Sequence, residues 1–176
     1  MKVSYNWLKD YIDIDKPVDE VSEILTNLGL EVENVEDFES IKGSLEGIIV
    51  GEVLSCKKHP NADRLILTNI DLGKEGKFKI VCGAPNIAKG QKVPVATVGS
   101  VIYTKSGEKI KISKSKIRGV VSNGMVCAEN EIGLGNSHDG IMVLDEKIKP
   151  GTPLSKIFEV ESDKILEIGL TPNRSD

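Results

Sequence analysis

The sequence predicts a mainly β protein with α+β flanks, in which a small β barrel is inserted into a split α+β domain. Three observations predict this class. From residue 40 onward, short segments rich in Val and Ile alternate with Gly, Pro, Asn and Asp, as in an antiparallel meander. Helical periodicity precedes the meander, and a helical turn and a strand follow it. Because neither flank is long enough to hold a core alone, we expect the two flanks to pack together.

The first 39 residues predict two helices and then a strand. Ser4 is a candidate N-cap, and the apolar residues after it have helical spacing: Trp7, Leu8, Tyr11 and Ile12. A second apolar series at helical spacing covers positions 18–28, after Pro17, and Gly29 stands where a C′ glycine belongs. Alternating apolar residues then predict a strand over residues 30–38.

The central segment predicts five strands, at residues 47–56, 64–72, 78–84, 92–102 and 108–113. Five strands in about 75 residues suit a small closed or partly open barrel of the OB type. Residues 122–134 predict a short helix capped by Ser122, and residues 141–145 predict a late strand.

The last segment predicts a helical turn at 153–158 and a strand at 163–170 that pairs with the strand at 30–38. The expected organisation is therefore residues 1–39 as the first half of the split domain, 40–149 as the OB-type domain, and 150–176 as the second half. The sequence stops within the turn-rich stretch TPNRSD and not at the end of a helix or strand, so we expect the chain to be a piece of a longer protein.

Composition sets limits on the class of protein. The net charge is −4 and 39% of the residues are hydrophobic, as in soluble folded proteins. No apolar run approaches the ~20 residues that a bilayer requires, and the charged N-terminus does not resemble a signal peptide. The cysteines are odd in number and widely spaced, which favours reduced thiols: Cys56, Cys82 and Cys127. We expect a cytoplasmic protein.

Catalytic and metal-binding patterns are weak. Only His59 and His138 could act as a base near neutral pH, and neither belongs to a recognised nucleophile motif. Cys56 and His59 have half of a zinc-ligand spacing, but no second pair of ligands exists. We predict no catalytic residue and no metal site in this chain.

Two stretches are rich in basic residues. The first, KKHPNADRL at 57–65, crowds Lys57, Lys58, His59 and Arg64 around a turn, and the turn alone would explain its Pro, Asn and Asp residues. The second runs from Lys105 to Arg118, and its strand lysines could equally protect a sheet edge. Lys109 and Lys111 differ in parity from Lys114, Lys116 and Arg118, so a kink near residues 113–115 would be needed to bring all of them to one face. Since aromatic residues are only 4%, phosphate contacts should dominate over base stacking.

Several motifs together resemble a known family. HPNADRL, VCGAPNI and KIRGVVSNGMVCAENEIGL are similar to the tRNA-binding OB domain found in and around aminoacyl-tRNA synthetases. VCGAPN, the opening SYNWLKDYI and the closing GLTPNRSD are similar to the N-terminal part of the beta subunits of bacterial phenylalanyl-tRNA synthetases. The resemblance covers nearly the whole chain.

The resemblance implies an RNA-facing surface and a set of partners. Its motif positions are Lys57, His59, Asn61, Arg64, Arg118, Ser122 and Asn123, to which the basic stretches add Lys58, Lys109, Lys111, Lys114 and Lys116. The implied partners are tRNA, specifically tRNA-Phe, and a synthetase alpha subunit in an (αβ)2 assembly, with no membrane and no DNA. ATP and Mg²⁺ would be used at the alpha-subunit active site, so no cofactor is expected in this segment.

Three functions remain open at this point. The first is a tRNA-binding part that helps a phenylalanine–tRNA ligase to capture tRNA. The second is a structural and protein-interaction part of the synthetase with little RNA contact. The third, an independent enzyme, has the least support because the catalytic patterns above are missing.

Overall fold

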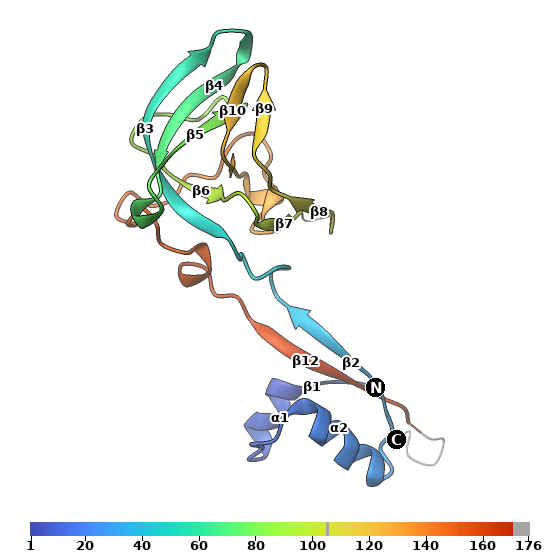
Figure 1. The fold of residues 1–176 in the computed structure, drawn as a ribbon. Coiled ribbons are helices and arrows are strands. Elements are labelled where there is room, and N and C mark those ends of the chain that lie inside the picture. The colour runs from blue at the N-terminus through green and yellow to red at the C-terminus, as the bar shows by residue number, and fades with distance from the viewer. Residues whose placement is uncertain (105, 171–176) are drawn as a thin grey trace. The chain divides into compact units, whose positions relative to one another are not determined.

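The computed structural model describes residues 1–104 and 106–170, which form two compact units (Figure 1). Unit 1 combines Met1–Ser40 with the segment from Glu161 onward, and unit 2 is Ile41–Val160. The mainly β class with α+β flanks is confirmed. Lys105 and the closing TPNRSD lie outside the described residues. Among the described residues, neither helix has the length and hydrophobicity to cross a bilayer.

Unit 1 is a three-stranded antiparallel sheet with two helices. The strand order is β1-β12-β2, and the elements are β1 (Lys2–Ser4), α1 (Tyr5–Tyr11), α2 (Val18–Asn27), β2 (Val32–Glu39) and β12 (Ser162–Ile168). The predicted pairing between the strands near 30–38 and 163–170 is confirmed, since Leu166 lies opposite Val35. Because β12 is the central strand, the last strand in sequence holds the first and second strands together (Figure 1).

The helix ends of unit 1 follow from local sequence. The Ser4 hydroxyl accepts a hydrogen bond from the Trp7 backbone N–H at 2.9 Å, as expected of an N-cap. Helix α2 starts directly after Pro17, and Gly29 follows it with a φ of +87°.

The predicted apolar face of α1 is wrong in part. Trp7, Tyr11 and Ile12 are 53%, 69% and 57% exposed. The reason is that α1 has only seven residues, and its Tyr5 and Leu8 are the side chains that pack into the unit 1 core around Leu166.

Unit 2 contains a five-stranded antiparallel sheet of order β11-β6-β3-β4-β5 and two hairpins, β7–β8 and β9–β10. The strands are β3 (Ile48–His59), β4 (Ala62–Asp71), β5 (Lys77–Cys82), β6 (Lys92–Ala96), β7 (Val101–Tyr103), β8 (Lys109–Lys111), β9 (Ser115–Ile117), β10 (Val120–Ser122) and β11 (Met125–Val126). Short 3₁₀ helices cover Gly73–Glu75, Glu129–Glu131 and Leu154–Lys156. Among the described residues the strand pairings leave the five-stranded sheet open.

Strand β3 organises unit 2 because it has two partners in succession. Its first half pairs with β6 and its second half with β4. The Ile48 and Val50 side chains enter one apolar cluster, and Val53 enters a second. Gly51 lies between these side chains, and it has no space for even a methyl group.

Three expected elements differ in the structure. Residues 122–134 do not form a helix: Ser122 ends β10, Met125–Val126 form β11, and only Glu129–Glu131 is a 3₁₀ turn. Gly124 explains the break, since its φ of +124° is not helical. The late strand at 141–145 is reduced to a single bridge between Leu144 and Lys92, and the segment at 92–102 divides into β6 and β7.

A first prediction concerns Gly51. A Cβ added there would lie 2.4 Å from the Ile70 side chain and 2.8 Å from that of Leu72, both fully buried. Gly51→Ala should therefore reduce the free energy of unfolding of unit 2 by about 1–3 kcal/mol through overpacking. Urea unfolding measures this. The control is Gly83→Ala, whose Cβ would meet only Leu65 at 3.6 Å. Equal effects of the two substitutions would contradict the packing argument.

A second prediction concerns Leu166, which is fully buried in the central strand of unit 1. Leu166→Ala should cost about 2–5 kcal/mol and unfold or loosen unit 1 selectively. Hydrogen exchange measured by mass spectrometry should then accelerate in residues 1–40, whereas residues 41–160 keep their protection. Equal acceleration in both units would show that they do not behave as separate cooperative units.

Candidate nucleic-acid interface

The first basic stretch forms the hairpin between β3 and β4, whose two-residue turn is Pro60–Asn61. The His59 imidazole holds this turn: its Nδ1 accepts from the Asn61 backbone N–H at 3.0 Å. Its Nε2 lies 3.3 Å from the carbonyl oxygen of Ile117. A neutral ring with its proton on Nε2 satisfies both contacts. His59 is only 5% exposed, so its side chain supports the turn, and its contact with RNA stays a prediction.

The contact between His59 and Ile117 brings the two basic stretches together. Ile117 ends β9, and the β9–β10 hairpin turns through Arg118 and Gly119, whose φ values are +47° and +95°. Two successive positive φ angles are typical of the tight turns that match the twist of a hairpin. The neighbours of the contact, Lys58 and Lys116, are therefore on adjoining hairpins, and both are exposed.

Part of the second basic stretch does not join this cluster. Lys109 and Lys111 are exposed on β8, which among the described residues pairs with β7 alone. Figure 1 places β8 well away from the β3–β4 turn within unit 2. A kink near residues 113–115 was the condition for all these cations to share one face. A break is present there, since residues 112–114 separate β8 from β9 and Lys114 lies in it. On one side of the break, Lys109 and Lys111 lie on β8; on the other, Lys116 and Arg118 lie on the β9–β10 hairpin.

A groove runs between the outer face of β3–β4–β5 and the β9–β10 hairpin. It has a volume of about 230 Å³. Both polar and apolar side chains line the groove: Ser55, Lys57, Leu67, Thr68, Asn69, Lys79, Ile80, Val81, Val120 and Val121. In register, Lys57 lies opposite Leu67, and Lys79 lies opposite Asn69. Two ammonium groups thus border a floor that is partly apolar.

Ser122 and Asn123 build the groove rather than line it. The Ser122 hydroxyl accepts from the Val81 backbone N–H at 3.0 Å and donates to the Gly124 carbonyl at 3.0 Å. The Asn123 backbone N–H donates to the Lys79 carbonyl at 2.9 Å. Ser122 is 1% exposed, so its hydroxyl serves the backbone in this structure, and its contact with RNA stays a prediction as well. Both residues attach the end of β10 to β5.

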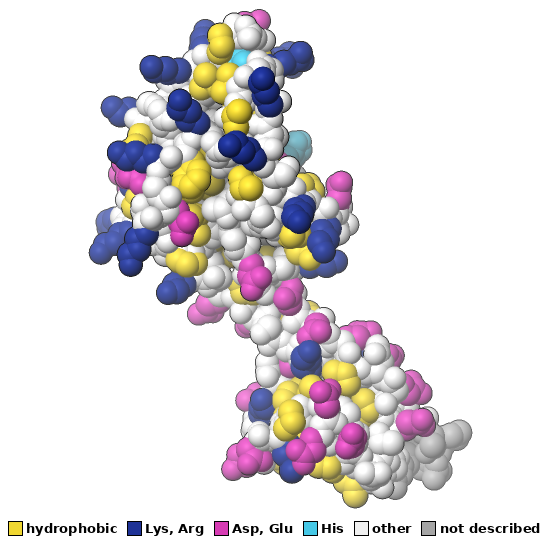
Figure 2. Space-filling view, in the orientation of Figure 1, with side chains coloured by type: hydrophobic (Ala, Val, Ile, Leu, Met, Phe, Trp, Pro, Cys, Tyr) yellow, Lys and Arg dark blue, Asp and Glu magenta, His cyan; other side chains and the backbone are white. Residues whose placement is uncertain are grey.

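Sequence reasoning missed Lys79. The signal was present in the run Lys77–Cys82, where Lys79 alternates with Phe78 and Ile80 and must therefore point away from the core. Most of the predicted site residues are exposed near or between these hairpins: Lys57, Lys58, Asn61, Arg64, Lys114, Lys116 and Arg118. Asn123 is half-buried. Figure 2 shows Lys and Arg side chains gathered over the surface of unit 2.

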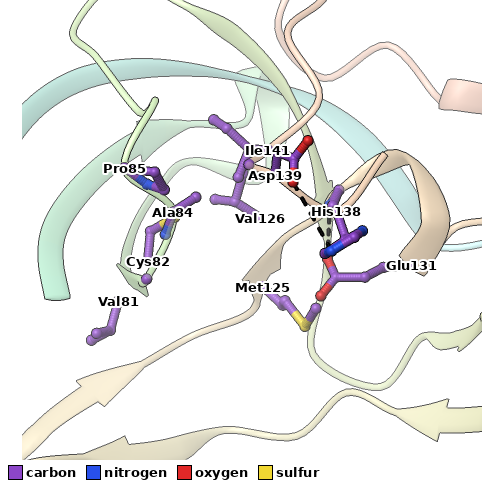
Figure 3. Close-up of a pocket in the computed structure, with 13 residues that line it drawn as sticks. Val81, Cys82, Ala84, Pro85, Met125, Val126, Glu131, His138, Asp139 and Ile141 are labelled. Atoms are coloured by element: carbon purple, nitrogen blue, oxygen red, sulfur yellow. Dashed lines mark hydrogen bonds and ion pairs between the residues drawn. The ribbon is translucent and has the colours of Figure 1, made fainter. Parts of the chain in front are cut away.

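A second hollow, of about 340 Å³, lies in unit 2 and shares Val81 with the groove (Figure 3). Cys82, Ala84 and Pro85 form one wall, and Met125, Glu131 and His138 face them in Figure 3. A Glu131 carboxylate oxygen accepts from the Ala128 backbone N–H at 2.7 Å, which caps the 3₁₀ turn. This carboxylate is therefore engaged in supporting the local backbone.

The thiols of unit 2 are poor nucleophiles. Burial raises the pKa of the Cys82 thiol and raises that of Cys127 to about 12, and it also raises the pKa of Cys56. Protonated thiols neither attack carbonyls nor bind metals well. In residues 1–104 and 106–170, no group of three or more His, Cys, Asp and Glu side chains could hold a metal ion. The groove that Lys57 and Lys79 border is instead suited to binding a polyanion.

Comparison with known proteins agrees with this chemistry. A family model described as a putative tRNA binding domain matches residues 48–153. The whole chain is 54% identical to the phenylalanine–tRNA ligase beta subunit of Bacteroides fragilis and 46% identical to that of Chlorobaculum tepidum. In both cases the chain spans only 21% of the relative's length.

Similarity to solved structures is weaker. The MetRS-related protein from Pyrococcus horikoshii is 20% identical, with 60% of this chain and 85% of that chain covered and a TM-score of 0.43, which is too low to assign the fold.

Residues 48–153 make up 106 of the 176 residues, and they include β3, β4, β5, the β9–β10 hairpin and every lining residue of the groove. The chain therefore belongs to the family of putative tRNA binding domains, and over its whole length it is a homologue of phenylalanine–tRNA ligase beta subunits.

Proposed function

We propose that unit 2 binds tRNA in the groove between β3–β4–β5 and the β9–β10 hairpin. The observation that carries the proposal is the pair of exposed lysines, Lys57 and Lys79, that border one groove in a unit of the matched family. Lysine ammonium groups contact phosphates as point charges, whereas the valines and Leu67 offer an apolar surface for riboses or base edges.

The charge of the chain supports this assignment. Residues 41–160 contain 18 Lys and Arg against 12 Asp and Glu, a net charge of +6 in a chain whose total is −4. Positive charge concentrated on one unit attracts a polyanion even when the whole protein is acidic. Five exposed cations predicted as site residues extend the same positive surface beyond the groove: Lys58, Arg64, Lys114, Lys116 and Arg118. The predicted site residue Asn61 adds an exposed amide in the β3–β4 turn.

The position of unit 2 in a larger enzyme is also part of the proposal. Identity of 43–54% between the whole of this chain and about a fifth of the length of phenylalanine–tRNA ligase beta subunits supports a role in capturing tRNA-Phe for a cytoplasmic (αβ)2 ligase. The ATP, Mg²⁺ and phenylalanine of that ligase would bind outside this segment. An OB-type barrel is the finer fold that we propose for unit 2. Its order of strands, with a long first strand shared between β4 and β6, supports it.

A third prediction tests the groove. Each phosphate contact contributes about 0.7 to the log–log salt slope for single-stranded RNA, so three to five contacts give a slope of roughly −2 to −4. Lys57→Ala/Lys79→Ala should flatten the slope by about 1.4 and weaken binding of a tRNA-Phe transcript. Fluorescence anisotropy at several salt concentrations measures both.

The matched control for this variant is Lys109→Ala/Lys111→Ala, which removes the same charge from β8, away from the groove. The control should bind with nearly the wild-type slope. If the two double variants lose equal affinity and slope, the net charge of unit 2 and not the groove binds RNA. If neither changes binding, unit 2 is instead a structural part of the ligase.

A fourth prediction separates support of the groove from contact with RNA. Ser122→Ala leaves the part-buried Val81 N–H without the Ser122 hydroxyl as its acceptor, which should cost about 1 kcal/mol of stability. It should also weaken tRNA binding by loosening β10, while the salt slope stays unchanged because no cation is lost. Thermal unfolding and the anisotropy titration check the two parts. A reduced slope would show that Ser122 acts on the phosphate contacts themselves.

A further inference from the structure

Unit 1 has a hollow that combines aromatic and acidic walls. Its volume is about 430 Å³, and it lies beside the start of α1 and the adjoining ends of β2 and β12. Trp7 and Phe38, which are 53% and 47% exposed, supply the aromatic surface. Asp10, Glu161 and Asp163 supply three carboxylates. Aromatic faces and carboxylates both bind organic cations.

The hollow is firmly built at its base. Asp163 accepts hydrogen bonds from the Ser4 hydroxyl and from the Asn6 backbone N–H, the latter at 2.9 Å. The Asn6 side chain donates to the Ser162 carbonyl at 2.8 Å. Partial burial alone would raise the pKa of Asp163, but these hydrogen bonds and one from the Lys164 N–H outweigh it and hold the pKa below its usual value. Asp163 therefore contributes a negative charge at neutral pH.

The aromatic side is extended by neighbouring side chains. Trp7 and Tyr11 form an edge-to-face pair with ring centroids 4.9 Å apart. Tyr11 and Ile12 are themselves 69% and 57% exposed, although they are large and apolar. Exposed aromatic residues that lie next to each other mark protein-interaction surfaces more often than isolated ones do.

The charge of unit 1 indicates the nature of the partner. Residues 1–40 and 161–176 contain 15 Asp and Glu against 5 Lys and Arg, a net charge of −10. Figure 2 shows acidic side chains over this unit, in contrast to the basic ones over unit 2. An RNA would be repelled here, whereas a basic protein segment is complementary.

We propose that this hollow docks a partner protein through a segment that presents an arginine beside an apolar side chain. The guanidinium stacks on Trp7 or Phe38 and pairs with Asp10 and Glu161, and the apolar neighbour packs against Tyr11 and Ile12. Arginine is favoured over lysine because its planar group both stacks on an indole and forms two parallel hydrogen bonds to a carboxylate. This surface is separate from the RNA groove of unit 2.

The test uses the single tryptophan of the chain, Trp7, as a fluorescent reporter. The probe is a twelve-residue peptide with two arginines flanking a leucine in a Gly/Ser background, titrated at 50 mM salt. The comparison peptide carries citrulline, the uncharged isostere, in place of both arginines. We expect saturable change of Trp7 emission with the arginine peptide and about tenfold weaker binding with citrulline.

Two charge-matched variants locate the site. Asp10→Asn/Glu161→Gln removes two carboxylates that line the hollow, whereas Asp13→Asn/Glu31→Gln removes two exposed carboxylates elsewhere in unit 1. Only the first pair should weaken binding of the arginine peptide, by about tenfold. Trp7→Ala, followed by calorimetry, should abolish measurable binding without unfolding the unit, because Trp7 is half exposed.

Three results would overturn the proposal. Equal binding of the citrulline peptide would show that the cation is not recognised. Equal loss in the two charge-matched pairs would reduce the effect to net charge. Concentration-dependent self-association that Asp10→Asn/Glu161→Gln abolishes, measured by analytical ultracentrifugation, would make a second copy of this chain the occupant instead of another protein.

Discussion

The candidate RNA groove depends on three hydrogen bonds that hold a short hairpin against a larger sheet. The β9–β10 hairpin has only three residues in each strand, and an isolated two-stranded ribbon of this size is not stable in water. The His59 ring at Ile117 fixes its tip, and the Ser122 hydroxyl and the Asn123 N–H fix its base to β5. Without these bonds the groove would have one wall, and Lys57 and Lys79 would lie on an open surface.

The sequence predicted most of the elements because their signals are local. The Ser4 cap, the helix stop at Gly29 and the β-strand alternation near 32–38 and 162–168 each depend on neighbours in the chain. The positions of His59 and Ser122 depend on partners 58 and 41 residues away, so their burial was not visible in the sequence. Their polar side chains were assigned to RNA, whereas the fold uses them to satisfy backbone groups. The helical spacing predicted for Trp7 was correct, but it did not show that Trp7 is exposed, because α1 has only seven residues and packs through Tyr5 and Leu8.

Separation of charge is the second organising feature. A net charge of −4 conceals one unit at −10 and another at +6. Screening limits each field to roughly 8 Å at physiological salt, so each unit presents its own sign to a partner at contact distance. An acidic surface repels RNA, so the charges of the two units favour contact of a polyanion with unit 2. The same acidic unit leaves aromatic residues exposed, and the two features together are complementary to a basic protein segment.

The central claim is that RNA occupies the groove beside β10, and an NMR titration of the ¹⁵N-labelled chain with tRNA-Phe transcript tests it most directly. The account predicts that amide signals of Leu67, Asn69, Lys79 and Val121 shift or broaden first, while those of β7–β8 and of unit 1 remain unchanged. Perturbations confined to β7–β8 or to the hollow of Figure 3, with the groove signals unaffected, would contradict it.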